Sequence, residues 1–196
     1  MIETQALNQL LLEAFSGKIT WLQASTRYPL EEYIDSFHRT RALMEKTVSD
    51  MTDAQVAYAA DANPTWSISE AVTHLIFSQN FYYNQLLEIT TSELPHILEA
   101  AKGFGEGSKQ NVPAEELRVN LRKATILIND AIEKTRVSHD TARVTRNPLF
   151  GDVNYETWIL LLLGHEVDHI RQSILMRRLA RAATKSQDRE KPSGTV

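Results

Sequence analysis

A long and almost uniformly apolar helix is predicted by the segment SISEAVTHLIFSQNFYYNQLLEI, residues 67–89. Ser67, followed three residues later by Glu70, matches a capping box, in which each side chain satisfies a free backbone N–H of the first turn. Apolar residues then occur on nearly every side of the helix, as expected for a helix deep in a bundle. His74 lies inside this apolar run.

Three more long helices are predicted from apolar residues that recur at helical spacing. They begin near Pro29, near Pro113 and near Tyr155. No convincing alternating strand pattern is present, and residues 147–152 are predicted to form a turn. The expected fold class is therefore all-α, a four-helix bundle with an extra N-terminal helical segment. The predicted organisation is an extension at 1–28, the bundle at 29–183 and a disordered tail at 184–196.

Composition narrows the classes of function. Hydrophobic residues make up 42% of the 196-residue chain, which is typical of a folded globular domain. The net charge of −4 argues against nucleic acid as a partner. The chain contains no Cys, so metal chemistry must use His, Asp or Glu. We find neither a secretory signal nor an apolar run long enough to span a membrane, and we expect a cytoplasmic protein without a membrane partner.

The histidines are the candidate functional residues. His165 and His169 are four residues apart, so both rings lie on one face of a helix, about one turn apart. Such pairs also arise by chance on partly exposed faces. His74 in the most apolar helix favours a site that binds a divalent metal through three imidazoles, although a lone His there is more often a hydrogen-bonded core residue. Three imidazoles leave a coordination position open, as in catalytic sites.

Three short stretches carry a resemblance to a known family: WSISEAVTHL at 66–75, PLFG at 148–151 and HEVDHIRQ at 165–172. Together they resemble the DinB/YfiT-like metalloenzymes over residues 30–183. The resemblance implies a four-helix bundle in which His74, His165 and His169 are the metal ligands and the metal is nickel, zinc or iron. It also implies a thiol-dependent transferase or isomerase with a low-molecular-weight thiol as a cosubstrate, and a homodimer. The open metal position could instead activate water, so a hydrolase that acts on a small-molecule substrate is also expected.

Two other interpretations remain open. The string from His165 to His169 also fits H-E-x-x-H, the zinc-metalloprotease pattern in which Glu166 would be the general base. The metzincin continuation requires Gly and His where the chain has Gln172 and Leu175. A non-catalytic helical bundle that serves as an interaction or stress protein would bind no stoichiometric metal.

Several other residues have weaker predicted roles. Asp168 is preferred over Glu70 as the residue that orients a ligand imidazole, and Glu166 is expected to be solvated or salt-bridged. His38 is expected at the edge of the bundle. The arginines at 171, 177, 178 and 181 could form a basic surface near the end of the last helix, but stabilisation of a helix C-terminus is the preferred interpretation. Residues that could line the pocket but are more often core are Phe77, Gln79, Tyr82 and Tyr83. His96 and His139 are expected to be exposed in connecting segments.

Overall fold

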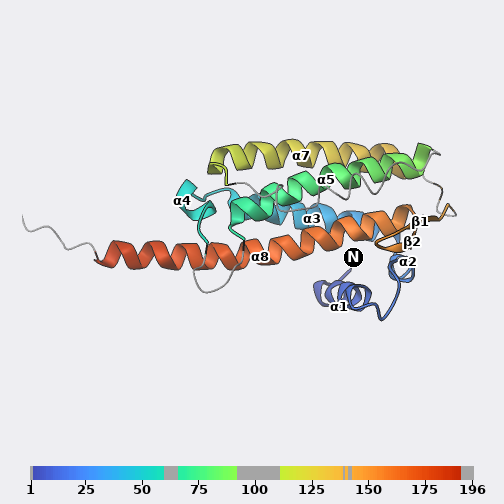
Figure 1. The fold of residues 1–196 in the computed structure, drawn as a ribbon, viewed down its shortest axis with the longest axis horizontal. Helices are drawn as coiled ribbons and strands as arrows, with labels where there is room; N and C mark the ends of the chain where they lie inside the picture. Colours follow the sequence, from blue (N-terminus) through green and yellow to red (C-terminus); the bar gives the residue numbers. More distant parts are fainter. Residues whose placement is uncertain (1, 60–65, 92–110, 139, 141–142, 191–196) are drawn as a thin grey trace, which may run out of the picture.

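The computed structural model describes residues 2–59, 66–91, 111–138, 140 and 143–190. Four long helices lie side by side and form the body of the molecule (Figure 1). They are α3 (Leu30–Val48), α5 (Ile68–Thr91), α7 (Ala114–Arg136) and α8 (Tyr155–Glu190). Three short helices accompany them: α1 (Thr4–Phe15), α2 (Trp21–Ser25) and α4 (Asp53–Val56). The predicted all-α four-helix bundle with additional N-terminal helices is confirmed.

The helix starts follow from local chemistry. Ser67 and Glu70 form the predicted capping box, because Ser67 N–H donates to the Glu70 carboxylate at 2.8 Å and Glu70 N–H donates to Ser67 Oγ at 3.1 Å. α3 and α7 each begin directly after a proline, Pro29 and Pro113. Each of these two helices also carries two glutamates in its first turn, where they favourably face the positive end of the helix dipole.

The structure differs from the prediction on both sides of α8. Before it, β1 (Thr145–Asn147) and β2 (Gly151–Val153) form an antiparallel pair, with Arg146 opposite Asp152. The prediction that strands are absent is wrong here, because three-residue strands are too short to show alternation. At the other end, α8 continues to Glu190, beyond the predicted end at Ala183. Residues 191–196 of the predicted tail lie outside the described residues.

The turn between the two strands lies where the sequence predicted one. The Asn147 side-chain oxygen accepts hydrogen bonds from the backbone N–H groups of Leu149 and Phe150, at 2.8 and 3.1 Å. Gly151 follows with a φ of 77°, a conformation that side-chain-bearing residues rarely adopt. The two strands show no strand-like sequence pattern. Asn147 and Gly151 instead stabilise the turn that joins them.

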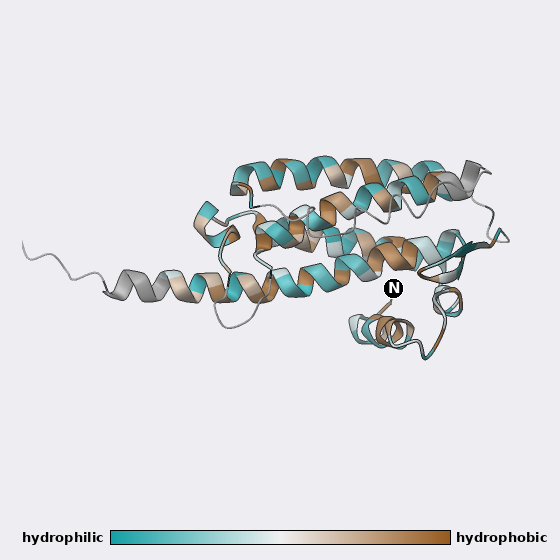
Figure 2. Ribbon diagram, in the orientation of Figure 1, coloured by the Kyte–Doolittle hydropathy of each residue, from teal (hydrophilic) through white to brown (hydrophobic). Residues whose placement is uncertain are grey.

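The N-terminal helices share the core of the bundle. Buried apolar residues of α1 and α2 belong to the same cluster as those of α3 and α8, and Figure 2 shows hydrophobic residues in brown along α1 and along α8. α1 approaches α8 closely at Gly164, where an added Cβ would lie 3.2 Å from the Leu11 Cδ2 atom. On α2, the Ser25 hydroxyl is 3.1 Å from that of Thr157 in the core. The predicted 1–28 extension is thus packed against the bundle.

Within the described ranges, none of the helices is both long and apolar enough to cross a membrane.

Candidate metal centre

Three histidines from two helices converge between α5 and α8. His74 lies near the start of α5, and His165 and His169 lie one turn apart on α8. One ring nitrogen of each histidine lies within 4.8 Å of the other two. The Nε2 atom of His165 is 3.4 Å from Nε2 of His74 and 3.2 Å from Nε2 of His169. The structure therefore brings together all three residues that were predicted as metal ligands.

The separations between these nitrogens suit a shared cation. A tetrahedral ion with metal–nitrogen distances of about 2.0–2.1 Å places neighbouring ligand nitrogens about 3.3 Å apart. Two of the three separations in this cluster are close to that value. The donor set consists of neutral nitrogen ligands without any thiolate, which suits zinc, nickel and iron alike. The residues present thus fit the divalent ion that the sequence predicted.

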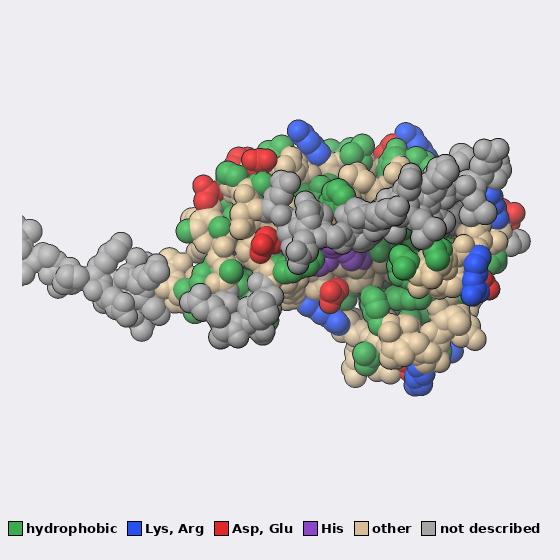
Figure 3. All heavy atoms as spheres, in the orientation of Figure 1, with side chains coloured by type: hydrophobic (Ala, Val, Ile, Leu, Met, Phe, Trp, Pro, Cys, Tyr) green, Lys and Arg blue, Asp and Glu red, His purple; other side chains and the backbone are tan. Residues whose placement is uncertain are grey.

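Aromatic rings surround the histidines. The Trp66 ring stacks on the His169 ring, with centroids 5.6 Å apart and planes 18° apart. It meets the His74 ring edge to face, with centroids 4.8 Å apart. Tyr82 lies 5.8 Å from the His165 ring. His74 and His169 are buried, whereas His165 is partly exposed, and histidine atoms are visible on the face shown in Figure 3. The cluster thus has apolar walls and a side that faces the outside.

Burial favours the neutral form of His165 and His169. Burial, together with positive charge on His169, His74 and Arg41, lowers the pKa of His165 from 6.5 to about 3. Burial also lowers the pKa of His169, while the Asp168 carboxylate and the hydrogen bond to Gln172 oppose that shift. A neutral imidazole is the form that binds a metal, so His165 and His169 can coordinate one near pH 7 without first losing a proton.

Lowering the pH from 7 to 5 is expected to destabilise the metal-free protein. His165 titrates near 6.5 in the unfolded chain but near 3 in the folded protein. Between these values the unfolded chain binds more protons, so the free energy of unfolding falls as the pH falls, by up to about 1.4 kcal/mol per pH unit. Urea denaturation at several pH values measures this slope. A His165→Gln variant should show a shallower slope, and an unchanged slope would contradict the assignment.

The residue that orients His169 is not the predicted one. The His169 Nδ1 atom is 3.3 Å from Oε1 of Gln172, one turn further along α8. An Nδ1–H donated to this oxygen leaves the lone pair on Nε2, the atom that points into the cluster. Asp168 is exposed and acts on His169 only through its charge. Glu70 is held in the capping box. Gln172, and not Asp168, is therefore the residue that orients the His169 imidazole.

Glu166 lies in a buried ion pair. Its carboxylate accepts a hydrogen bond from the Arg41 guanidinium of α3, and each side chain is only 1% exposed. Arg41 Nη2 also donates to Gln79 Oε1 of α5 at 2.7 Å, and the Gln79 amide donates to the backbone carbonyl of Ala124 in α7. Burial raises the pKa of Glu166, and Arg41 opposes that rise. This chain of contacts joins all four long helices beside the histidines.

Sequence reasoning missed Arg41 altogether, although a signal was present. The apolar face of α3 includes Tyr33, Phe37, Met44 and Val48, and Arg41 fills the gap in that periodicity. A charged residue on a face that is otherwise buried indicates a buried partner. The expectation that Glu166 forms a salt bridge is correct, but the pair lies in the core.

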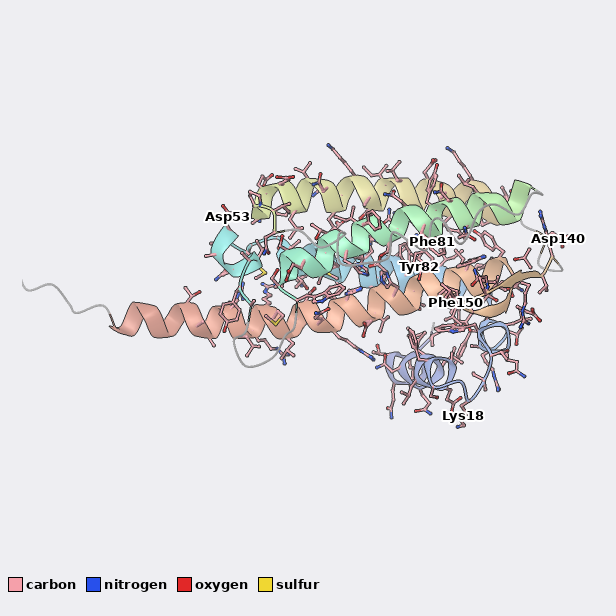
Figure 4. All side chains as sticks on the ribbon, viewed as in Figure 1. Lys18, Asp53, Phe81, Tyr82, Asp140 and Phe150 are labelled. Atoms are coloured by element: carbon pink, nitrogen blue, oxygen red, sulfur yellow. The ribbon has the colours of Figure 1, made fainter. Side chains whose placement is uncertain are left out.

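The remaining candidates have different surroundings. Tyr82 packs on Phe81 and on Trp158, and Phe150 also packs on Trp158. Figure 4 labels Phe81, Tyr82 and Phe150, which lie toward the hairpin end of the bundle. Phe77 is 43% exposed and lines a separate hollow between α5 and α7. His38 is half-buried on α3, outside the three-histidine cluster. His96 and His139 lie outside the described residues.

Comparisons with known proteins agree with this architecture. The chain is similar in fold to YfiT from Bacillus subtilis, which is described as a probable metal-dependent hydrolase with an unusual four-helix bundle topology. The TM-score is 0.59 at 20% sequence identity, over 78% of this chain and 88% of that one. None of the curated proteins gives a significant match. The sequence model of the DinB superfamily matches residues 36–173, and the chain therefore belongs to the DinB superfamily.

Proposed function

We propose that this protein is a metal-dependent hydrolase of small-molecule substrates, with His74, His165 and His169 as the ligands of one divalent ion. The observation that carries the proposal is the convergence of three Nε2 atoms on one point between α5 and α8. A three-imidazole set leaves a coordination position for water or substrate, as catalytic sites do. The description of YfiT as a metal-dependent hydrolase supports the same class of reaction.

The bound ion would supply Lewis-acid chemistry, which lowers the pKa of a bound water and polarises a substrate oxygen. The chain's own residues prepare the position for it. Gln172 fixes the ring of His169, and burial keeps His165 neutral. Trp66 and Tyr82 place apolar surface around the ligands, which limits competing water. Zinc, nickel and iron all suit this ligand set, so we propose one of these three as the native ion.

The surroundings of Glu166 weigh against the zinc-protease interpretation. In the H-E-x-x-H mechanism this glutamate must act as a general base on the metal-bound water. In this protein Glu166 is buried and paired with Arg41. The third histidine comes from α5, a helix far away in the sequence, and not from a continuation of the pattern on α8. We therefore favour hydrolysis of small molecules over proteolysis.

A reconstitution experiment tests the proposal. The purified full chain is stripped of metal, reloaded with zinc, nickel or iron, and assayed on small esters and amides with and without a low-molecular-weight thiol. We expect metal-dependent hydrolysis that needs no thiol, is lost in His169→Ala and persists in His38→Ala. If product formed only in the presence of the thiol, thiol transfer would be the reaction instead of hydrolysis. Failure to bind metal stoichiometrically would overturn the proposal in favour of a non-catalytic bundle, and stoichiometric binding without any turnover would overturn the proposed hydrolase activity while leaving the metal site.

A further inference from the structure

A second hollow of ligand size lies on the other side of α8. It has a volume of about 370 Å³ and lies between α1, α3 and α8, within the range of small-molecule pockets. Its lining is largely apolar and includes Leu7, Leu43, Val167 and Ile170. α1, which provides one wall, lies outside the residues that match the DinB superfamily. The hollow therefore depends on the N-terminal extension of this chain.

Another hollow lies next to this one along the same two long helices. It has a volume of about 310 Å³, lies between α3 and α8, and shares Leu43 and Ile174 with the first. We call the two together the basic groove, because arginines line both parts and a lysine lines the second. Its cationic residues are Arg39 and Arg171 in the first part and Lys46, Arg177, Arg178 and Arg181 in the second. Lys and Arg atoms lie between α8 and α1 in Figure 3.

The groove is cationic although the chain as a whole carries a net charge of −4. Among the residues that the structure describes, neither Asp nor Glu lines either part. Asp50 at its end pairs with Arg177 and Arg181, at 2.8 and 2.6 Å. Across the described residues, no carboxylate lies within ion-pair distance of Lys46, Arg171 or Arg178. The groove therefore has more cationic side chains than paired carboxylates, and they lie beside apolar side chains. An anion with a hydrocarbon tail is complementary to such a lining.

These arginines have the role that the sequence suggested only in part. Arg177 Nη1 donates to the backbone carbonyls of Lys46 and Thr47 in the last turn of α3, at 3.2 and 3.0 Å. They were expected to stabilise a helix C-terminus, but α8 continues to Glu190. Favourable interaction with the helix dipole is confined to the last turn, and even Arg181 lies more than one turn before the end. For α8 itself that prediction is wrong, because the helix is longer than the apolar periodicity indicated. Contacts with the end of α3 do not account for Arg171 and Arg178, for which neither a helix-end carbonyl nor an ion pair is recorded among the described residues.

We propose that the basic groove binds a single-chain fatty carboxylate. The tail lies in the first part against Leu7, Val167 and Ile170 and passes between Leu43 and Ile174, and the carboxylate lies among Lys46 and Arg178 in the second part. Charge-assisted hydrogen bonds from arginine to carboxylate are stronger than neutral ones. A concave, two-part shape of this size suits one free amphiphile rather than a flat membrane surface. This site is separate from the histidine cluster and does not depend on the proposed hydrolase activity.

Calorimetric titration of the full chain with monomeric dodecanoate tests the proposal. We expect one equivalent to bind, and we expect dodecyltrimethylammonium, which has the same tail and the opposite charge, to bind at least about ten-fold more weakly. Leu43→Gln, at a 45% exposed position that lines both parts, and Arg178→Gln should each weaken dodecanoate binding about ten-fold, or about 1.4 kcal/mol.

Matched controls separate the groove from general effects. Leu175→Gln changes a 52% exposed leucine of α8 outside the groove, and Lys134→Gln changes an exposed lysine of α7. Both should bind dodecanoate like the wild type, and all four variants should keep the wild-type melting temperature and metal content. Equal binding of the two amphiphiles would overturn the proposal. So would equal losses in the groove and control variants, or binding to anionic vesicles without binding to monomeric dodecanoate.

Discussion

His74→Ala is expected to lower the affinity of the protein for zinc by more than about 100-fold. Loss of a residue that merely orients a ligand costs about 10- to 100-fold in metal affinity, and loss of a ligand should cost more. His74 provides one of three converging nitrogens, and no other His, Asp or Glu in the described ranges joins the cluster. His169→Ala should have a similar effect. Competition with a chromophoric chelator, together with elemental analysis after dialysis, measures both.

The comparison with His38→Ala gives this experiment its control. His38 is also a helical histidine, but it is half-buried, lies on α3 and is outside the cluster. Its replacement should leave zinc affinity unchanged. Because His74 is buried, a His74→Asn variant that retains more volume checks that the loss does not reflect a collapsed core. If metal were lost with His169→Ala but retained with His74→Ala, the α8 pair would bind it without α5.

The parts of the site that the sequence predicted are those with a local signature. The pair on α8 follows from a spacing of four residues in one helix. His74 stands out because it interrupts an apolar run. Its convergence with the pair, 91 residues later in the chain, depends on how α5 packs on α8. A buried His74 beside a helical His pair already favoured a three-imidazole site, and the resemblance to DinB/YfiT-like metalloenzymes implied that the three residues converge.

The parts that escaped prediction depend on rotamers and on distant contacts. Asp168 and Gln172 both lie within one turn of His169, and spacing alone cannot decide which side chain turns toward Nδ1. The partner of Glu166 is 125 residues away, on a helix whose rotation about its own axis the sequence does not specify. Helix starts with caps or prolines were predicted closely. The end of α8 was placed at Ala183, where the apolar periodicity stops, although the first proline and glycine after it in the sequence, Pro192 and Gly194, follow the observed end at Glu190.

Arg41→Met is expected to lower the free energy of unfolding by about 3–5 kcal/mol, the range for a buried ion pair that loses one partner. The substitution leaves the Glu166 carboxylate in the core, 1% exposed and without the guanidinium that compensates its charge. It also removes the donor to Gln79 and thereby breaks the link from α3 to α5. Chemical denaturation of the metal-free protein measures the loss.

The double variant Arg41→Met, Glu166→Met tests whether the ion pair itself stabilises the fold or whether only the loss of one partner is destabilising. Replacing both charges by apolar side chains removes the desolvation penalty together with the attraction, so the double variant should be more stable than either single variant. Single losses below about 1 kcal/mol would mean that water reaches the pair, contrary to its burial. Glu166 directly follows His165, so the double variant also reveals whether the pair positions that ligand. If it does, zinc affinity falls in the double variant even though stability recovers.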